Sequence, residues 1–169
     1  SEFNLLDDHD QFFSYAEAYL SASNQLCRRM ESDDTFYTWP NASVILMLAT
    51  HGVELFLKGA LLKRKVEILG HNIQQLADKY RQEFKEPTLA WDIPFASPLS
   101  ETERIASMKQ EWPDIDEAKL KKSIESIPDP SVLYRYPLYR SGKKWRTLCG
   151  FTTATEFLST LDQINHDFK

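Results

Sequence analysis

The chain has 169 residues, of which 42% are hydrophobic and 27% are charged, and its formal net charge is −5 at pH 7. These fractions are ordinary for a soluble globular protein, and a chain of this length buries about 70% of its unfolded surface in one core. The acidic balance argues against a protein that coats polyanions in general, although a local basic patch can still bind phosphate. We therefore expect one domain over residues 1–169.

Several familiar kinds of site are missing from the sequence. The two cysteines, Cys27 and Cys149, form neither a disulfide framework nor a metal site. There is no phosphate-binding loop, no dinucleotide-binding fingerprint and no serine nucleophile elbow. We therefore expect no metal and no cofactor.

Two long helices are expected in the first part of the chain. Apolar residues recur at helical spacing over residues 10–30, with acids in front of them and arginines behind, as the helix dipole favours. A polar loop over residues 31–38 leads to the second helix, where Pro40 is acceptable in the first turn.

The second helix is apolar nearly all round over residues 42–62, which is typical of a helix buried in a core. Replacing Leu55 by alanine is therefore expected to cost roughly 2–5 kcal/mol. His51, Glu54 and Lys58 form one polar line, because residues three or four apart share a helix face. A buried helix keeps such a line only if partners satisfy it, so the line is either a structural ion network or a ligand-binding site. It also argues against a membrane span, and we expect a cytoplasmic protein.

A third helix is expected after Gly70, which breaks the second one, with His71 or Asn72 as its cap and an apolar stripe that reaches Phe84. The segment that follows, 85–99, contains three prolines and several large apolar side chains. We expect it to be an ordered excursion that buries Leu89, Trp91, Ile93 and Phe95.

Two capping boxes mark later helices. Ser100 and Glu103 begin a short helix that should end before Pro113, and Thr153 and Glu156 begin the last helix. Residues 114–126 are expected to form another short helix. With no alternating strand pattern, the sequence predicts an all-α fold: an up-and-down bundle of four long helices with one or two short additional helices.

Residues 131–155 reverse the local sign of charge, because they contain cations and aromatic rings but no aspartate or glutamate. Cations neutralise phosphates and aromatic rings stack on unpaired bases, so this segment is a candidate RNA-binding edge. The other interpretation is a loop whose tyrosines pack on the bundle while its cations face water. The candidate ligand-binding residues here are Arg135, Tyr136, Arg140, Lys143, Lys144 and Arg146.

The helix from His51 to Leu62, followed by the run Gly70-His71-Asn72-Ile73 and Leu76, resembles the HEPN superfamily of small helical proteins. The close match covers about 35 residues, and Arg135-Tyr136-Pro137 is a weaker echo of the same family. The resemblance implies a helical bundle, frequent dimerisation and a link to RNA cleavage or nucleotide binding. It also implies a bacterial defence or toxin–antitoxin setting, with an antitoxin-like partner protein.

Many HEPN ribonucleases carry an arginine that is separated by four to six intervening residues from a late histidine. Arg64 and His71 fit that spacing, but they flank Gly70 in the middle of the chain. The last helix has His166, and the nearest preceding arginine is the distant Arg146. Arg64 and His71 are therefore only weak catalytic candidates, and little intrinsic ribonuclease activity is expected.

The preferred interpretation is a homodimeric module that binds RNA or nucleotides. Two alternatives stay open, namely a metal-independent endoribonuclease and a dimeric scaffold without a ligand.

Overall fold

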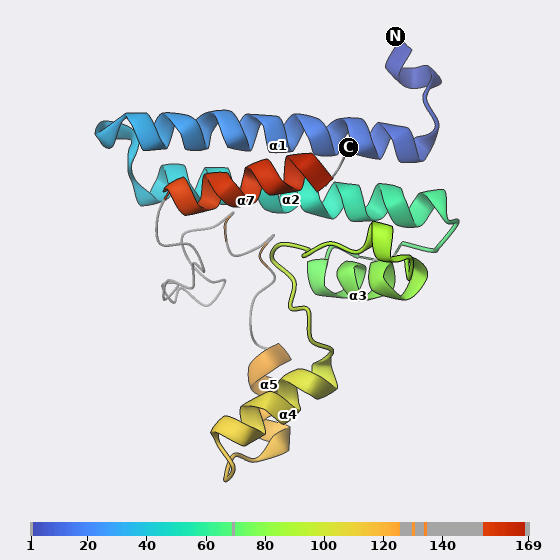
Figure 1. Cartoon of the computed structure of the whole chain (residues 1–169), viewed down its shortest axis with the longest axis vertical. Helices are drawn as coiled ribbons and strands as arrows, with labels where there is room; N and C mark the ends of the chain where they lie inside the picture. Colours follow the sequence, from blue (N-terminus) through green and yellow to red (C-terminus); the bar gives the residue numbers. More distant parts are fainter. Residues whose placement is uncertain (1, 69, 126–129, 131–133, 135–153, 168–169) are drawn as a thin grey trace.

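The structure is a computed structural model that describes residues 2–68, 70–125, 130, 134 and 154–167. Over these residues every regular element is a helix and there is no strand (Figure 1). The expected all-α class is therefore confirmed for the part of the chain that is described.

The two longest helices form an antiparallel hairpin. A short 3-10 turn, η1 (Glu2–Leu5), precedes α1 (Asp8–Ser32), and η2 (Asp34–Phe36) joins α1 to α2 (Trp39–Lys63). The helices approach each other very closely at two glycines of α2. A Cβ atom on Gly52 would lie 2.7 Å from Leu20 Cγ, and one on Gly59 would lie 2.9 Å from Phe13 Cε1. The missing side chains are thus what allows the close contact.

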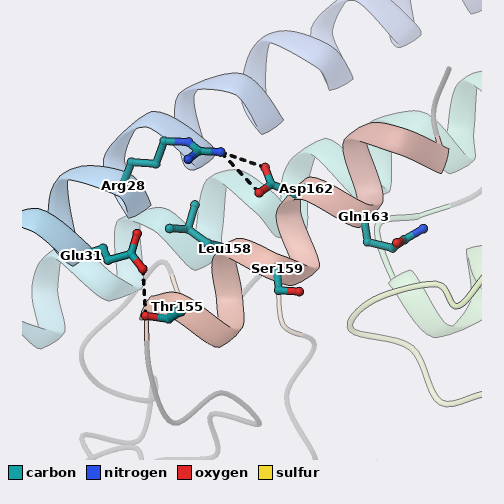
Figure 2. A pocket seen from close by; sticks show the side chains of 7 residues that line it. All are labelled: Arg28, Glu31, Thr155, Leu158, Ser159, Asp162 and Gln163. Atoms are coloured by element: carbon teal, nitrogen blue, oxygen red, sulfur yellow. Dashed lines mark hydrogen bonds and ion pairs between the residues drawn. The ribbon is translucent and has the colours of Figure 1, made fainter.

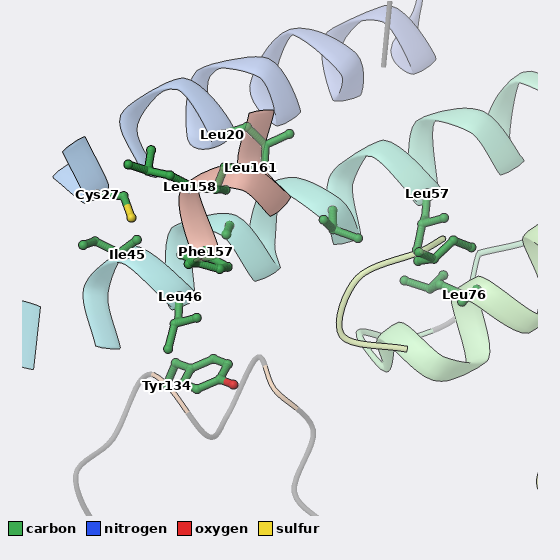
Figure 3. Close-up of a cluster of buried hydrophobic side chains, with 14 of the residues drawn as sticks. Leu20, Cys27, Ile45, Leu46, Leu57, Leu76, Tyr134, Phe157, Leu158 and Leu161 are labelled. Atoms are coloured by element: carbon green, nitrogen blue, oxygen red, sulfur yellow. The ribbon is translucent and has the colours of Figure 1, made fainter. Parts of the chain in front are cut away.

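Two shorter helices pack on this hairpin. The last helix, α7 (Ala154–Asp167), lies along α1, where the Arg28 guanidinium binds Asp162 and Thr155 donates to Glu31 (Figure 2). The third helix, α3 (Ile73–Glu83), packs on α2. The core lies where these helices meet, and its fully buried members include Leu20, Ile45, Leu57, Leu76 and Leu161 (Figure 3).

The rest of the described chain extends away from this core. The segment up to residue 99 contains η3 (Pro87–Leu89). In this segment Ile93 is buried, whereas Leu89 is 39% exposed. The expected burial of Leu89 is therefore wrong. The hairpin of α4 (Glu101–Glu111) and α5 (Glu117–Glu125) then projects from the body (Figure 1). Ser100 and Glu103 form the predicted capping box of α4. The second predicted box begins at Thr153, which lies outside the described residues.

The expectation of four long helices is met only in part. Helices α1 and α2 have 25 residues each, whereas α3 has 11 and α7 has 14. Helix α3 follows its predicted stripe and ends at Glu83, where Phe84 is the C-cap residue and stacks on Tyr80 with ring centroids 4.4 Å apart. The Tyr80 hydroxyl also donates to the Leu89 carbonyl, which holds the outgoing chain against the helix.

Helix α2 is not buried all round. By length and composition alone, α2 could cross a membrane, but 67% of its most apolar stretch is buried inside the protein. The core helix of a soluble protein has the same length and composition, so this is weak evidence of a span. One row of α2 remains partly exposed, and it includes Leu55 and Val44. The sequence-based choice of Leu55 as a core residue is therefore wrong.

We predict that Leu57→Ala lowers the free energy of unfolding by roughly 2–5 kcal/mol, because Leu57 is fully buried and its truncation leaves a cavity. Leu55→Ala is the matched control on the same helix, and its cost should be clearly smaller because Leu55 is only half-buried. Urea unfolding followed by far-UV circular dichroism measures both. Equal losses for the two variants would contradict the orientation of α2 described above.

The end of α2 contains a strained residue. The Val66 amide donates to the Leu61 carbonyl and the Lys65 amide donates to the Leu62 carbonyl, which is the Schellman pattern of a helix end. In this pattern Lys65 has a φ of 60°, a left-handed conformation that favours glycine.

We predict that Lys65→Gly raises the free energy of unfolding by about 1 kcal/mol, because glycine removes the steric cost of the left-handed conformation. The neighbouring Lys63→Gly should instead destabilise the protein by about 1 kcal/mol, since Lys63 lies inside the helix. Thermal and urea unfolding of the two variants provide the measurement. Destabilisation by both glycines would mean that the helix continues through Lys65.

Candidate functional site

The polar line of α2 surrounds one buried carboxylate. Glu54 is fully buried, and it lies on the same helix face as His51 and Lys58. Lys58 is only 8% exposed as a residue, and its ammonium donates to Glu54 Oε1 at 2.8 Å. The line thus satisfies the charge of Glu54 within α2 itself, in the i, i+4 orientation that favours a Glu–Lys pair.

A histidine from outside α2 completes the cluster. His71 Nδ1 lies 2.7 Å from Glu54 Oε1 and 3.2 Å from Lys58 Nζ. One ring nitrogen cannot donate to the carboxylate and accept from the ammonium at once, and the shorter distance favours donation to Glu54. His71 is free for this role because its neighbour Asn72 caps α3 by accepting from the Gln75 amide.

The second carboxylate oxygen faces the other histidine. His51 Nδ1 lies 3.5 Å from Glu54 Oε2, and neither atom has a hydrogen bond of good geometry. The His51 ring also meets the Tyr19 ring edge-on, with centroids 4.6 Å apart. We call Glu54, Lys58, His71 and His51 the Glu54 cluster.

The electrostatics of the cluster keep Glu54 ionised. Burial alone would raise the pKa of Glu54, but the close approach of His51 and the hydrogen bonds from Lys58 and His71 outweigh burial and lower that pKa to about 2. The negative charge of Glu54 and the positive charge of Lys58 then cancel. Protonation of either histidine would make the cluster cationic.

His71 is the member that can reach a ligand. Its side chain is 75% exposed although its Nδ1 is anchored to a fully buried group. With Nδ1 turned inward, Nε2 is directed away from the carboxylate and is available to donate to an anion or to accept a proton. The first amides of α3 follow directly in the chain, and the start of a helix favours negative charge. The cluster can therefore bind a phosphate group or move a proton at its surface.

The other predicted catalytic candidate does not join the cluster. Arg64 binds Glu86 Oε1 at 3.0 Å, and its guanidinium lies over the Phe84 ring at 4.8 Å from the centroid. No hydrogen bond or ion pair links Arg64 to His71, which are both described. The structure therefore does not bring these two side chains into direct contact, and Arg64 is paired with Glu86 instead.

The basic aromatic segment contributes little to the described site. The candidates Arg135, Tyr136, Arg140, Lys143, Lys144 and Arg146 lie outside the described residues. Tyr134 is described, and it is buried against the core near Leu46 (Figure 3). For this one residue, the interpretation that the tyrosines of the segment pack on the bundle is supported.

Sequence reasoning missed a groove between α1 and α7. It has a volume of about 510 Å³ and is lined by Arg28, Glu31, Asp162 and Gln163, among others (Figure 2). The groove is wide and shallow, and its charges already pair, with Arg28 Nη2 3.1 Å from Asp162 Oδ1. No local pattern could reveal it, because its two sides come from opposite ends of the chain.

Two places could be considered for a metal ion. At the Glu54 cluster, Lys58 Nζ already holds the position that a cation would take beside the carboxylate. At the start of α1, ligand atoms of Asp7, His9 and Asp10 lie within 4.8 Å of one another. These three side chains are near-neighbours in sequence and largely exposed, and exposed acids often gather without binding an ion.

Comparisons of the chain with protein-family models, with curated proteins and with solved structures found no match.

We predict that the stability from the Glu54 cluster is lost in acid. The pKa of Glu54 falls from an ordinary 4.5 to about 2 in the folded protein, so its stabilising effect is complete above pH 4.5 and disappears as the pH drops through 2. At neutral pH, Glu54→Gln should cost roughly 3–5 kcal/mol, because it leaves Lys58 without its charged partner. The difference between wild type and variant should shrink steadily below pH 4.5.

Urea unfolding at a series of pH values measures this difference. Glu83→Gln is the control, since Glu83 is exposed on α3 and makes no ion pair among the described residues. A Glu54→Gln penalty that stayed constant down to pH 2 would show that the carboxylate is not held in its ionised form.

Proposed function

We propose that this protein is an RNA- or nucleotide-binding module of the HEPN type, in which His71 contacts a phosphate group. In this proposal the first amides of α3 add positive potential around the phosphate. The imidazole then bridges a buried carboxylate on one side and the ligand on the other.

One observation carries the proposal, namely that a fully buried carboxylate anchors a side chain that is itself 75% exposed. A histidine that only fastened α3 to α2 would gain from being covered, because water weakens its bond to Glu54. Exposure of the outer nitrogen is instead what ligand binding requires. The anchoring also lowers the entropy that the side chain loses when a ligand binds.

The resemblance to HEPN proteins supports the same proposal. The matching residues His51, Glu54, Lys58 and His71 are the four that form the Glu54 cluster. We extend the proposal to an up-and-down HEPN-like bundle in which α3 and α7 are shortened, and to a cytoplasmic role in bacterial defence or in a toxin–antitoxin pair.

A metal-independent endoribonuclease is the second candidate. The Glu54–His71 pair favours it, because a carboxylate that receives Nδ1–H leaves Nε2 as an acceptor for a 2′-hydroxyl proton. Against it stands the pairing of Arg64 with Glu86, which takes away the expected second catalytic group. We therefore place binding ahead of cleavage.

We predict that single-stranded RNA binds in a salt-dependent manner and that His71→Ala weakens binding roughly tenfold or more, the value of one charge-assisted hydrogen bond. His71→Lys should recover part of the affinity, because lysine supplies a positive charge near the same place. If His71 neutralises one phosphate, His71→Ala should also flatten the slope of log K against log salt by about 0.7. Fluorescence anisotropy of a labelled oligonucleotide over a salt series measures both quantities.

His166→Ala is the matched control, because His166 is an exposed histidine on α7 outside the Glu54 cluster. Its binding curve should coincide with that of the wild type. Equal affinities for wild type and His71→Ala, with both proteins folded, would refute a phosphate contact at His71. Cleavage of the oligonucleotide that is lost in His71→Ala would instead favour the endoribonuclease.

A further inference from the structure

A second pocket lies between α7 and the segment that follows η3. Its volume is about 540 Å³, which is within the range of small-molecule pockets. It adjoins the groove between α1 and α7 and shares Ser159 and Gln163 with it, and Figure 2 shows that both side chains point away from α1. We call it the α7 pocket, and its lining includes Trp91, Asp92 and Pro94 from the segment and Ser159, Thr160 and Gln163 from α7.

The wall of the pocket formed by residues 90–94 is held at both of its ends. Before this wall, the Tyr80 hydroxyl donates to the Leu89 carbonyl at 3.0 Å. After it, the Ser97 amide donates to Gln74 Oε1 at 2.7 Å. Both bonds tie the wall to α3, so its shape is set before a ligand arrives, and little ordering remains to be done on binding.

A strained residue fixes the distance between the two sides of the pocket. Phe95, directly after the wall, has a φ of 64°, a left-handed conformation that is rare for a bulky side chain. Its ring packs against that of Phe157 on α7, with centroids 6.4 Å apart. Backbone strain of this kind persists only where the surrounding structure imposes it, and it gathers at ligand sites. The strain at Phe95 thus supports a preformed pocket independently of the pocket's volume.

The charges of the α7 pocket favour a cation. Asp92 is exposed and makes no ion pair within the part of the chain that the structure describes. Residues 87–99 and 154–167, which supply the two sides, contain acids but no lysine or arginine. Asp162 of α7 is already paired with Arg28. An anion would therefore be repelled from the pocket, whereas a cation beside Asp92 gains a partner.

We propose that the α7 pocket binds a guanidinium group. This group is planar, pairs with a carboxylate through two parallel hydrogen bonds and stacks on aromatic rings. Asp92 supplies the carboxylate, and the neighbouring Trp91 supplies the aromatic surface. The Trp91 ring is held in place because it meets the rings of Phe56 and Tyr80 edge-on.

The other side of the pocket offers acceptors for the remaining N–H groups. The Thr160 hydroxyl donates to the Glu156 carbonyl at 3.3 Å, so its oxygen is left to accept from a ligand. Ser159, one residue earlier, is exposed and adds a second hydroxyl. A guanidinium has five N–H donors for such oxygens, whereas a quaternary ammonium has none and would leave them without partners.

The guanidinium can belong to a free small molecule or to an arginine side chain of another chain, since both present the same group. The proposal does not depend on RNA binding at His71, which is not among the residues that line the pocket.

NMR titration of the isotope-labelled protein with butylguanidine tests the proposal, and the indole signal of Trp91 reports on the pocket itself. The wild type should bind with a dissociation constant of about 1 mM or lower. Asp92→Asn should raise this constant roughly tenfold or more, because it removes a charge-assisted pair. Ser159→Lys should abolish binding, since it places a positive charge inside the pocket. Butylurea has nearly the same shape without the charge and should not bind.

Two matched variants control for the change of charge. Asp114→Asn removes the same charge from an exposed acid between α4 and α5, and Ser107→Lys adds the same charge at an exposed serine of α4. Both should bind butylguanidine like the wild type, and all four variants should keep the wild-type far-UV circular dichroism.

An acetylated Gly-Arg-Gly peptide distinguishes the two sources of the group. Tighter binding of the peptide than of butylguanidine assigns the guanidinium to an arginine side chain, and weaker binding assigns it to a free small molecule. The proposal is overturned if butylguanidine shifts no signal up to about 10 mM. It is equally overturned if Asp92→Asn leaves the dissociation constant unchanged, or if butylurea or butylamine binds as well as butylguanidine.

Discussion

The close contact between α1 and α2 determines how the other parts of this protein are arranged. Gly52 and Gly59 lie one heptad apart, and they let the α1 backbone approach to a distance that a methyl group would block. Two such points fix the rotation of α2 about its own axis. That rotation sends Leu57 into the core, directs Glu54 away from α1 toward the start of α3, and leaves Val44 and Leu55 partly exposed.

The Glu54 cluster follows from this geometry and from an energetic necessity. A carboxylate buried on the α3 side of α2 would be very costly alone, so Lys58, His71 and His51 surround it. The same contacts hold the start of α3 and orient the His71 ring. Structural and functional roles therefore coincide here, because the interaction that stabilises the buried charge also leaves Nε2 of His71 directed away from it.

Periodicity and capping chemistry in the sequence alone determined the helical class, the two long helices, the polar line on α2 and the capping box at Ser100, because these depend on residues within a few positions of each other. The depth of Leu55 was misjudged, since an all-apolar helix does not reveal which side its neighbours cover. Only the tertiary structure decided that His71 reaches Glu54 across 17 residues, that Arg64 turns to Glu86, and that Arg28 meets Asp162. Such contacts depend on how whole helices pack, which local patterns do not specify.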